Sequence, residues 1–201
     1  MQIDPRDTHF QGPVKHPSTY QFSQYNAGVR HAAKRRTAID VGAHIGIFTT
    51  RYAQHFQRVI AIEPVNVEYL RHNTQAYDNV EIYHNAASNR TGDKVYLYNP
   101  SHNNANSGAW EITETPTDTS ITTITIDSLN IKDADIIKID TQGVEYSVIE
   151  GAHNTIAECR PVIHIESRDE GLIQHICGKY NYIVQTVVVK DRILVPNKRK
   201  K

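Results

Sequence analysis

The ten residues TAIDVGAHIG, at positions 37–46, decide the fold class of this chain. An apolar run with one acid over 37–41 is typical of a buried strand, and Gly42 and Gly46 follow it. Apolar side chains then recur at helical spacing: Ile45, Phe48, Tyr52 and Phe56. We therefore expect a strand, a glycine turn and a helix over 45–56. Such a turn directs backbone N–H groups and the positive end of a helix dipole at one place, and its glycines let a ligand approach the main chain.

The spacing of the glycines indicates which cofactor would bind at this turn. A dinucleotide-binding turn has the pattern G-x-G-x-x-G, but the second and third glycine positions hold His44 and Ile47. An acid two residues before Gly42 and a glycine four residues after it resemble instead the turn of class I methyltransferases, which use S-adenosylmethionine (SAM). On that resemblance we expect five residues of the turn to bind SAM: Asp40, Gly42, Ala43, His44 and Gly46. The alternative is an ordinary strand-to-helix turn without a ligand.

The second strand adds to this prediction. Residues 58–63 form another apolar run that ends in Glu63 and is followed by Pro64. Glu63 lies 23 residues after Asp40, about the length of one strand–helix–strand unit. In both NAD-binding and SAM-binding folds an acid at this point receives the ribose hydroxyls, because a carboxylate accepts two hydrogen bonds at once. We expect Glu63 and Pro64 to bind the cofactor; the alternative for Glu63 is a solvated acid at a strand end.

Composition excludes several classes of partner. The 201 residues fit one domain, and 22 basic with 22 acidic residues give zero formal net charge, which argues against bulk nucleic-acid binding. No apolar stretch approaches the ~18 residues that span a membrane, and residues 1–17 lack the apolar core of a signal peptide. Cys159, Cys177 and the 11 histidines show no metal-binding spacing and no disulfide framework. We expect a cytoplasmic protein without a bound metal.

The order of the elements predicts an α/β fold: a doubly wound, Rossmann-like, mostly parallel sheet with a C-terminal antiparallel hairpin. Expected strands are 37–41, 58–63, 80–85, 94–98, 121–126, 134–140 and 160–166, and the hairpin pairs 183–189 with 192–195. Expected helices are 45–56, 65–77 and one from Val144 that includes Val148, Ala152 and Ile156. Residues 99–120 read as a long loop, of the kind that often binds ligands.

The same pattern divides the chain into three parts. We expect an N-terminal lead-in over 1–36, one domain over 37–195 and a basic tail over 196–201. Within the lead-in, residues up to about 19 look loosely structured. Residues 20–36 have helical character and would pack over the cofactor.

Four carboxylates stand at the ends of expected strands: Asp40, Glu63, Asp140 and Glu166. In a doubly wound sheet the carboxyl ends of the parallel strands lie on one edge, where ligands bind. Burying several charges there is costly unless a ligand compensates for it. The sequence therefore predicts a functional site at this edge.

Together these motifs resemble the FkbM family of SAM-dependent methyltransferases, over residues 37–195. The resemblance is carried by DVGA at 40–43, Glu63 with Pro64, KID at 138–140 with Gly143 and Glu145, Gly151 with Ala152, Arg160 with Pro161, and Glu166. It implies methyl transfer to oxygen, commonly on a hydroxyl of a sugar or of a natural product. Two positions depart from the family pattern: Gln142 is usually acidic there, and His44 is often asparagine. Gln142 removes a charge beside the expected reaction centre, and His44 keeps a side chain that can donate to the cofactor.

The expected reaction needs alignment of its reactants and a base. The methyl group of SAM is already electrophilic, but a hydroxyl acceptor must lose a proton. Asp140 is the first candidate for the base and is also expected to contact the cofactor; His164, Glu166 and Glu145 are the others. Alternatively, His164 is a packed histidine in an apolar strand and Glu145 a helix N-terminal acid. Asp140 and Glu166 could share a divalent cation, but two acids are too few to assert one.

The remaining parts of the expected site are the adenine wall and the acceptor. The end of the third strand, 84–88, would meet the adenine through Asn85 and Ala86, and the polar loop at 103–108 suits a polar acceptor. The function predicted is O-methylation of a small hydroxylated molecule such as a sugar or glycan, without a nucleic-acid or membrane partner. Two alternatives stay open: an NAD-dependent oxidoreductase, and a Rossmann-like SAM-binding module without catalysis, which Gln142 keeps possible.

Overall fold

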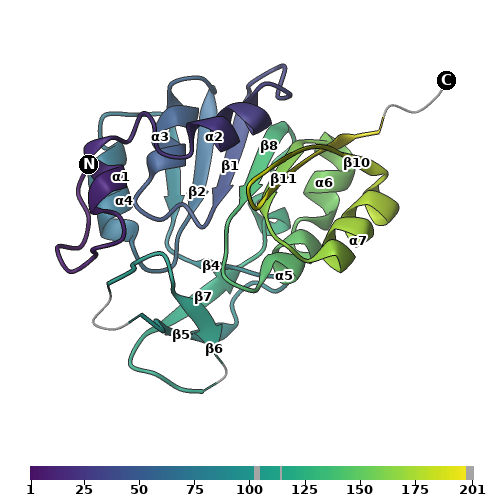
Figure 1. Cartoon of the computed structure of the whole chain (residues 1–201). Coiled ribbons are helices and arrows are strands. Elements are labelled where there is room, and N and C mark those ends of the chain that lie inside the picture. The colour runs from purple at the N-terminus through teal and green to yellow at the C-terminus, as the bar shows by residue number, and fades with distance from the viewer. Residues whose placement is uncertain (102–104, 114, 198–201) are drawn as a thin grey trace.

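The computed structural model describes residues 1–101, 105–113 and 115–197. Its main sheet has seven strands in the order β10-β11-β9-β8-β1-β2-β3 (Figure 1). The parallel strands are β1 (Thr37–Val41), β2 (Arg58–Ile62), β3 (Val80–Tyr83), β8 (Ala134–Ile139) and β9 (Val162–Glu166). The antiparallel strands β10 (Tyr182–Val188) and β11 (Asp191–Pro196) complete one side. This confirms the predicted fold class, including the C-terminal hairpin.

Helices cover both faces of the main sheet. On one face lie α2 (Phe22–Val29), α3 (Ile47–Ala53) and α4 (Val67–Thr74), and on the other lie α5 (Glu145–Glu150), α6 (His153–Cys159) and α7 (Glu170–Tyr180). Strand β1 alternates between these layers: Ala38 packs with α2 and α3, whereas Ile39 and Val41 pack on the opposite side. All five residues of β1 are buried, as expected for a parallel strand covered on both faces.

The helices of the main domain differ from the predicted helices in four ways. The helix expected over 45–56 begins at Ile47, because Gly46 has a positive φ of 90°, and ends at Ala53. The helix expected over 65–77 is the shorter α4. The single helix expected from Val144 is divided into α5 and α6 by a break at residues 151–152. Helix α7 was missed; Asp169 caps it by accepting from the backbone N–H groups of Gly171 and Leu172.

A second, smaller sheet lies at the carboxyl ends of the main strands (Figure 1). Its order is β4-β7-β5-β6, with β4 (Ala86–Ala87), β7 (Ser120–Ile124), β5 (Lys94–Tyr98) and β6 (Glu111–Thr113), and a 3-10 helix, η2 (Asp127–Leu129), leads back to β8. The expected strand 80–85 therefore ends at Tyr83, and its continuation joins the second sheet instead. The expected loop 99–120 contains β6, because these three residues pair antiparallel with β5.

The N-terminal segment is ordered against the domain, which corrects the expectation of a loosely structured start. A short helix, α1 (Gln11–Lys15), precedes α2, and the side chain of Asp7 is fully buried. The backbone N–H groups of Thr8 and His9 both donate to the carbonyl of Ala105, so residues 8–9 lie against the segment before β6. Helix α2 agrees with the helical character expected over 20–36. Of the expected basic tail, residues 198–201 lie outside the described part of the chain.

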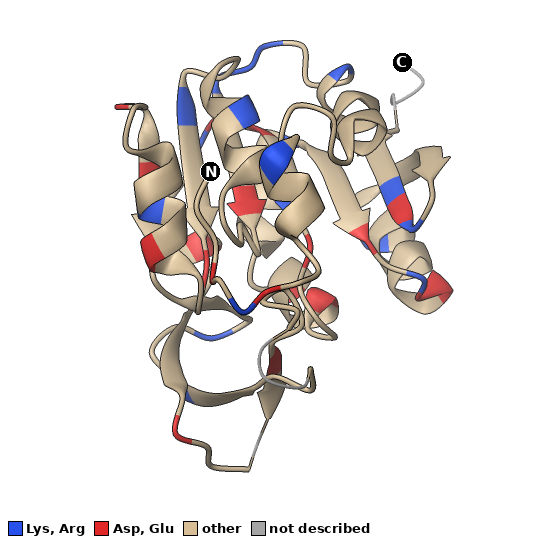
Figure 2. Ribbon diagram, turned by 60° about the vertical axis from the view of Figure 1, so that its left-hand side comes forward, with Lys and Arg blue, Asp and Glu red and all other residues tan. Residues whose placement is uncertain are grey.

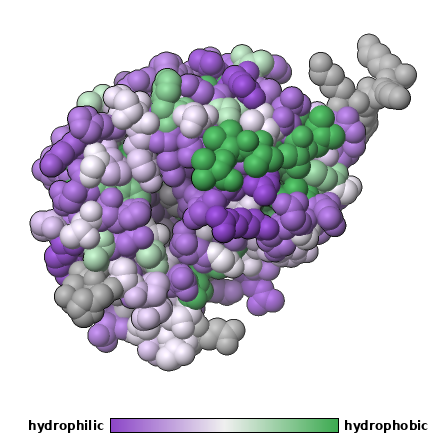
Figure 3. Space-filling model, viewed as in Figure 1, coloured by the Kyte–Doolittle hydropathy of each residue, from purple (hydrophilic) through white to green (hydrophobic). Residues whose placement is uncertain are grey.

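Two surface features complete the fold. Figure 2 shows acidic residues at the ends of several main strands, on the side that faces the second sheet. Figure 3 shows a hydrophobic patch where the β10–β11 hairpin lies, and the exposed apolar side chains of this hairpin are Ile183, Val184, Val187 and Val189. Among the described residues, no helix has the length and apolar character needed to cross a membrane.

Candidate functional site

The glycine turn after β1 is shaped by contacts within the protein. Gly42, His44 and Gly46 all have positive φ angles, of 73°, 52° and 90°. A Cβ on Gly42 would lie 2.0 Å from the backbone oxygen of Asp140, and one on Gly46 would lie 2.8 Å from Leu70 Cδ1. We expected these glycines to make room for a ligand. Within the protein, the absence of their side chains makes room for the end of β8 and for helix α4.

Asp40 lies behind the turn, fully buried within β1. Its carboxylate accepts a hydrogen bond from Thr49 Oγ1 at 2.7 Å and lies 3.5 Å from Lys138 Nζ. Lys138 also donates to Asp140 at 3.2 Å, so one ammonium group bridges two of the strand-end acids. Burial alone would lower the pKa of Lys138, but attraction by Asp140 and Asp40 outweighs it and raises this pKa. Asp40 thus fixes Lys138, which in turn holds Asp140.

Glu63 is the best-anchored acid of the site, with 4% of its surface exposed. Its Oε1 accepts from the backbone N–H groups of Val65 at 2.9 Å and Asn66 at 2.8 Å. Its Oε2 accepts from the N–H of His44 at 2.8 Å. Each carboxylate oxygen has about two lone-pair sites, so Oε2 retains capacity for a further donor such as a ribose hydroxyl.

A cavity of about 410 Å³ lies where the carboxyl ends of β1, β2 and β8 meet the second sheet. This volume is typical of a small-molecule site. Eight of the predicted site residues line it: Gly42, Ala43, His44, Glu63, Pro64, Ala86, Asp140 and Glu166. Five others are not among its lining residues: Asp40, Gly46, Asn85, Glu145 and His164. Most of the predicted cofactor site is therefore assembled around one space.

Two of the residues outside the cavity have structural partners instead. His164 is fully buried within β9, where its Nε2 lies 2.6 Å from Asp191 Oδ1 and its ring packs against Phe48. Asn85 donates from Nδ2 to the carbonyl and hydroxyl of Thr122, which fastens the end of β3 to β7. For His164 this arrangement corresponds to the alternative of a packed histidine.

Glu145 stands at the start of α5 and faces a neighbouring, more open hollow of about 380 Å³. It accepts from Thr141 Oγ1 and from the N–H of Gly143, both at 3.1 Å. The hollow shares four lining residues with the main cavity: Thr141, Gln142, Glu166 and Lys190. The two spaces therefore adjoin at Glu166, whereas Asp140 lines the main cavity but not the hollow; together these two acids form the acidic end of the cavity.

Glu166 differs electrostatically from the other acids. Burial raises the pKa of its carboxyl, and repulsion from Asp140 and Asp191 adds to this effect. The ammonium of Lys190, 3.4 Å away, opposes the shift without cancelling it. Glu166 consequently holds a proton more tightly than an ordinary glutamate, at the point where the cavity meets the hollow.

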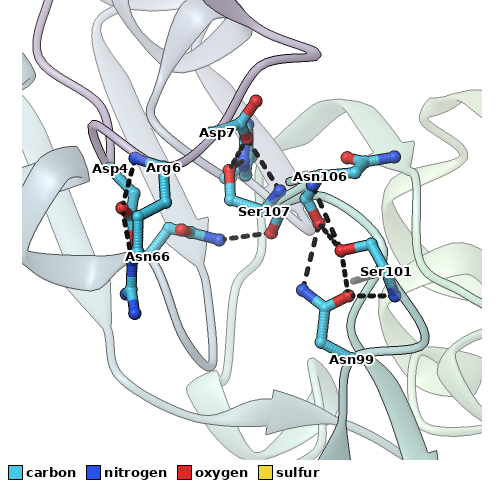
Figure 4. A network of polar contacts seen from close by, with 9 residues as sticks. Asp4, Arg6, Asp7, Asn66, Asn99, Ser101, Asn106 and Ser107 are labelled. Carbon is cyan, nitrogen blue, oxygen red and sulfur yellow. Dashed lines mark hydrogen bonds and ion pairs between the residues drawn. The ribbon is translucent and has the colours of Figure 1, made fainter. Parts of the chain in front are cut away.

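Sequence reasoning missed a cap over the cavity. We use this term for residues 4–10 together with 105–110, which meet in the network of Figure 4. Asp7 accepts from the N–H of Ser107 at 2.7 Å and from its hydroxyl, and Asn66 Nδ2 donates to the carbonyl of Ser107 at 2.9 Å. The polar loop expected at 103–108 contributes residues 105–108, while 103 and 104 are outside the described residues. No local pattern marks Asp7 as its partner.

Aromatic side chains line the cavity near the cap: Phe10, Tyr20 and Trp110. The Phe10 ring lies 4.4 Å from the His44 ring and 5.6 Å from the Tyr20 ring, measured between centroids. Residues 20 and 21, in the turn before α2, thus border the cavity, whereas α2 itself, which was expected to pack over the cofactor, contributes no lining residue. In the described part of the chain, no group of three or more His, Cys, Asp or Glu residues is arranged to hold a metal ion.

The parallel sheet with its reversed last strand and a cavity at the carboxyl edge defines a class I methyltransferase-like fold. The family profile described as "Methyltransferase FkbM domain" matches residues 40–181. The chain therefore belongs to the FkbM family of SAM-dependent methyltransferases, and its cofactor is SAM rather than NAD. Among curated proteins, no match was found.

Solved structures show the same fold. Methyltransferase FkbM from Methylobacillus flagellatus KT has a TM-score of 0.56 at 22% identity, covering 79% of this chain and 42% of that one. A precorrin-6y methyltransferase from Geobacter metallireducens GS-15 has a TM-score of 0.50 at 11% identity, covering 85% of both chains. A 16S rRNA methyltransferase from T. thermophilus, solved with SAM and guanosine, has a TM-score of 0.51 at 15% identity, covering 98% of this chain and 44% of that one. This chain spans less than half of the Methylobacillus protein.

The residues of the cavity fit SAM. Oε2 of Glu63 keeps a lone pair for a ribose hydroxyl, and Ala86 and Ala87 offer a wall of small side chains to the adenine. The glycine turn borders the same cavity through Gly42, Ala43 and His44. These groups would bind SAM so that its methionine end lies toward the acidic end of the cavity.

Proposed function

We propose that this chain methylates a hydroxyl oxygen of a small, polar, sugar-like molecule. The observation that carries this proposal is a pair of carboxylates at one end of the cavity: Asp140 lines the cavity, and Glu166 lines both the cavity and the adjoining polar hollow. Bound SAM supplies a methyl group on a positively charged sulfur. The protein must then hold the acceptor oxygen in line and receive its proton.

Glu166 is the group that takes the proton. Its raised pKa makes it a stronger base than an ordinary carboxylate, and it borders both spaces. Asp140 shares Lys138 with Asp40 and so has a fixed position, from which it accepts a hydrogen bond from a second hydroxyl of the acceptor, while the reacting hydroxyl donates to Glu166. The oxygen would receive the methyl group of bound SAM, with the electron pair kept on sulfur, while the hydroxyl proton would pass to Glu166.

The lining of the hollow supports a small polyhydroxyl acceptor. Hydrogen-bond donors and acceptors both line it, and two basic side chains stand among three acids. These polar lining residues are Thr141, Gln142, Glu145, Glu166, Ser167, Arg168, Asp169 and Lys190. A nucleic-acid site would instead present a continuous basic track to phosphates. Hydroxyl groups both donate and accept, which suits this mixture.

The test is formation of S-adenosylhomocysteine with a panel of sugars and glycans, followed by single-turnover rates at saturating SAM. Glu166→Gln is expected to lower the rate by roughly 10²–10⁴-fold, the usual share of general base catalysis, with SAM affinity unchanged. Asp140→Asn, which keeps the shape, is expected to lower it by about tenfold, the worth of one hydrogen bond. Glu158→Gln, in an exposed ion pair with Lys132, serves as the matched control.

The pH profile provides the second measurement. Glu166 must be deprotonated to act, so the rate is expected to fall as pH decreases through its raised pKa, at a higher pH than for an ordinary glutamate. This limb should disappear in Glu166→Gln. A large loss in Asp140→Asn with a small one in Glu166→Gln would assign the base to Asp140. Turnover with amines and with no hydroxyl compound would overturn O-methylation, and no turnover at all would favour a binding module.

A further inference from the structure

A chain of three side chains links the cap to the glycine turn. Asp7 from the N-terminal segment accepts from the hydroxyl of Ser107, and Ser107 Oγ lies 2.7 Å from His44 Nε2 (Figure 4 shows the Asp7–Ser107 part). The other oxygen of Asp7 accepts from the N–H of Phe10 at 2.7 Å. With the N–H of Ser107, the Asp7 carboxylate thus accepts three hydrogen bonds and donates none.

The direction of each hydrogen bond follows from the number of protons. The Ser107 hydroxyl has a single proton, and it goes to Asp7 because an ionised carboxylate has none to give. Ser107 Oγ can therefore only accept from His44, which places a proton on His44 Nε2. A neutral imidazole carries one ring proton, so Nδ1 is left with a free lone pair. Among the described residues, no other one hydrogen-bonds to this ring.

The surroundings keep His44 neutral. Burial lowers the pKa of its imidazole, and the positive charge of Lys138 acts in the same direction. The carboxylates of Glu63, Asp7 and Asp140 oppose this shift but do not overcome it. The ring borders the cavity, with three acids around it and an unused acceptor on Nδ1. These surroundings favour a positively charged hydrogen-bond donor beside His44 Nδ1.

We propose that Asp7 and Ser107 are positioning residues for the cofactor: they hold His44 as the Nε2–H tautomer, so that Nδ1 accepts a hydrogen bond from the α-ammonium group of SAM. The inference rests on SAM as the cofactor and is independent of the acceptor. It gives the cap a role in recognising the methionine end of SAM, and it reverses the expected role of His44 from donor to acceptor.

The first test reads the tautomer directly. In protein labelled with ¹⁵N-histidine, we expect the His44 resonances to show a proton on Nε2 and none on Nδ1. Addition of SAM should shift the Nδ1 resonance as it accepts a hydrogen bond. Addition of 5′-methylthioadenosine, which has the adenine and ribose but no ammonium, should leave that resonance close to its free position. A proton on Nδ1 in the unmodified protein would overturn the proposal.

The second test compares the same two ligands by calorimetry. Ser107→Ala removes the partner of Nε2 and is expected to weaken SAM binding by about 3–10-fold, the range for one net hydrogen bond, with 5′-methylthioadenosine binding unchanged. The matched control is Thr8→Val, which removes a different contact between the same segments, from Thr8 Oγ1 to the carbonyl of Ala105 at 3.4 Å. Equal losses for both ligands, or an equal effect of Thr8→Val, would show that the cap acts only as a cover.

The third measurement is the pH dependence of SAM binding. Protonation of His44 would remove the acceptor and repel the ammonium, so affinity is expected to fall as pH drops through the pKa of His44. Because this pKa is lowered, the fall should occur below the usual histidine range. A flat profile there would overturn the proposal. None of these measurements requires turnover, so a failure of O-methylation would leave them intact.

Discussion

The β1–β2 pair of the main sheet and the cap bring together segments at very different distances along the chain. Strand β1 pairs with β2 across one connecting helix, with Thr37 opposite Arg58. In the cap, Asp7 and Ser107 are separated by 100 residues. The sheet is held by buried apolar side chains such as Ile39 and Ile137, whereas the cap is held by hydrogen bonds to buried polar groups.

This difference has an energetic consequence. Apolar burial is non-directional and tolerates small shifts, so many residues of the sheet share its stability. A hydrogen-bonded cap depends on a few donors and acceptors, and each loss leaves a buried group without a partner. We therefore expect changes in the sheet to alter folding, and changes in the cap to alter ligand binding first.

The largest effect is expected from Gly42→Ala. The new Cβ would meet the backbone oxygen of Asp140, and the residue would keep a positive φ of 73°. Strain and overpacking together should lower the free energy of unfolding by at least about 3 kcal/mol. Urea unfolding followed by circular dichroism measures this. A loss below about 1 kcal/mol would mean that β1 and β8 can separate without harm to the sheet.

The next effect tests how the N-terminal segment is attached. The Arg51 guanidinium donates to the carbonyls of Pro17 and Tyr20 and lies over the rings of Tyr25 and Phe48 at 5.5 and 5.6 Å. Arg51→Met keeps the apolar stem but leaves two carbonyls unpaired, which should cost about 2–3 kcal/mol. Hydrogen exchange should rise first over residues 17–25. Faster exchange throughout the main sheet instead would show that this segment is part of the core.

Glu63→Ala is expected to act on the cofactor. Removing a charged acceptor should weaken SAM binding by roughly 1.5–3 kcal/mol, the worth of hydrogen bonds to a charged group. The backbone N–H groups of His44 and Asn66 also lose a partner, so the melting temperature must be measured alongside calorimetry. Unchanged SAM affinity in a folded variant would show that Glu63 does not bind the ribose.

The smallest effect serves as a reference for the others. Gly178 lies within α7, and a Cβ there would meet no atom within 4 Å. Gly178→Ala should raise the free energy of unfolding by about 0.5–1 kcal/mol, because alanine loses less conformational freedom in a helix. SAM affinity should not change. A weaker affinity would show that the α7 side of the sheet is coupled to the cavity.

Much of the sheet could be predicted from sequence because its signals are local. The glycine turn, the acid at the end of β2 and the closing hairpin each occupy a few consecutive residues. Helix α7 also had a local signal, with a capping Asp169 followed by Leu172, Ile173 and Ile176, so its omission was an error of interpretation.

Other features depend on contacts that no local pattern contains. The break between α5 and α6 lies at Gly151, which approaches the carbonyl of Ser88 so closely that a Cβ would lie only 2.0 Å away. Whether a strand residue such as His164 points at a helix or at the cavity depends on which elements cover that face. Asp7 has one local partner, the N–H of Phe10, but Ser107 lies 100 residues away and no sequence pattern connects the two.

The 100-residue separation between Asp7 and Ser107 also has a consequence during synthesis. A ribosome adding ~5–20 residues per second makes Asp7 about 5–20 s before Ser107 exists. During this interval β1 and β2 can already pair, whereas the Ser107 hydroxyl that donates to Asp7 has not yet been made. The segment around Asp7 must therefore stay solvated during this interval, and it can dock over the cavity only after Ser107 has been made.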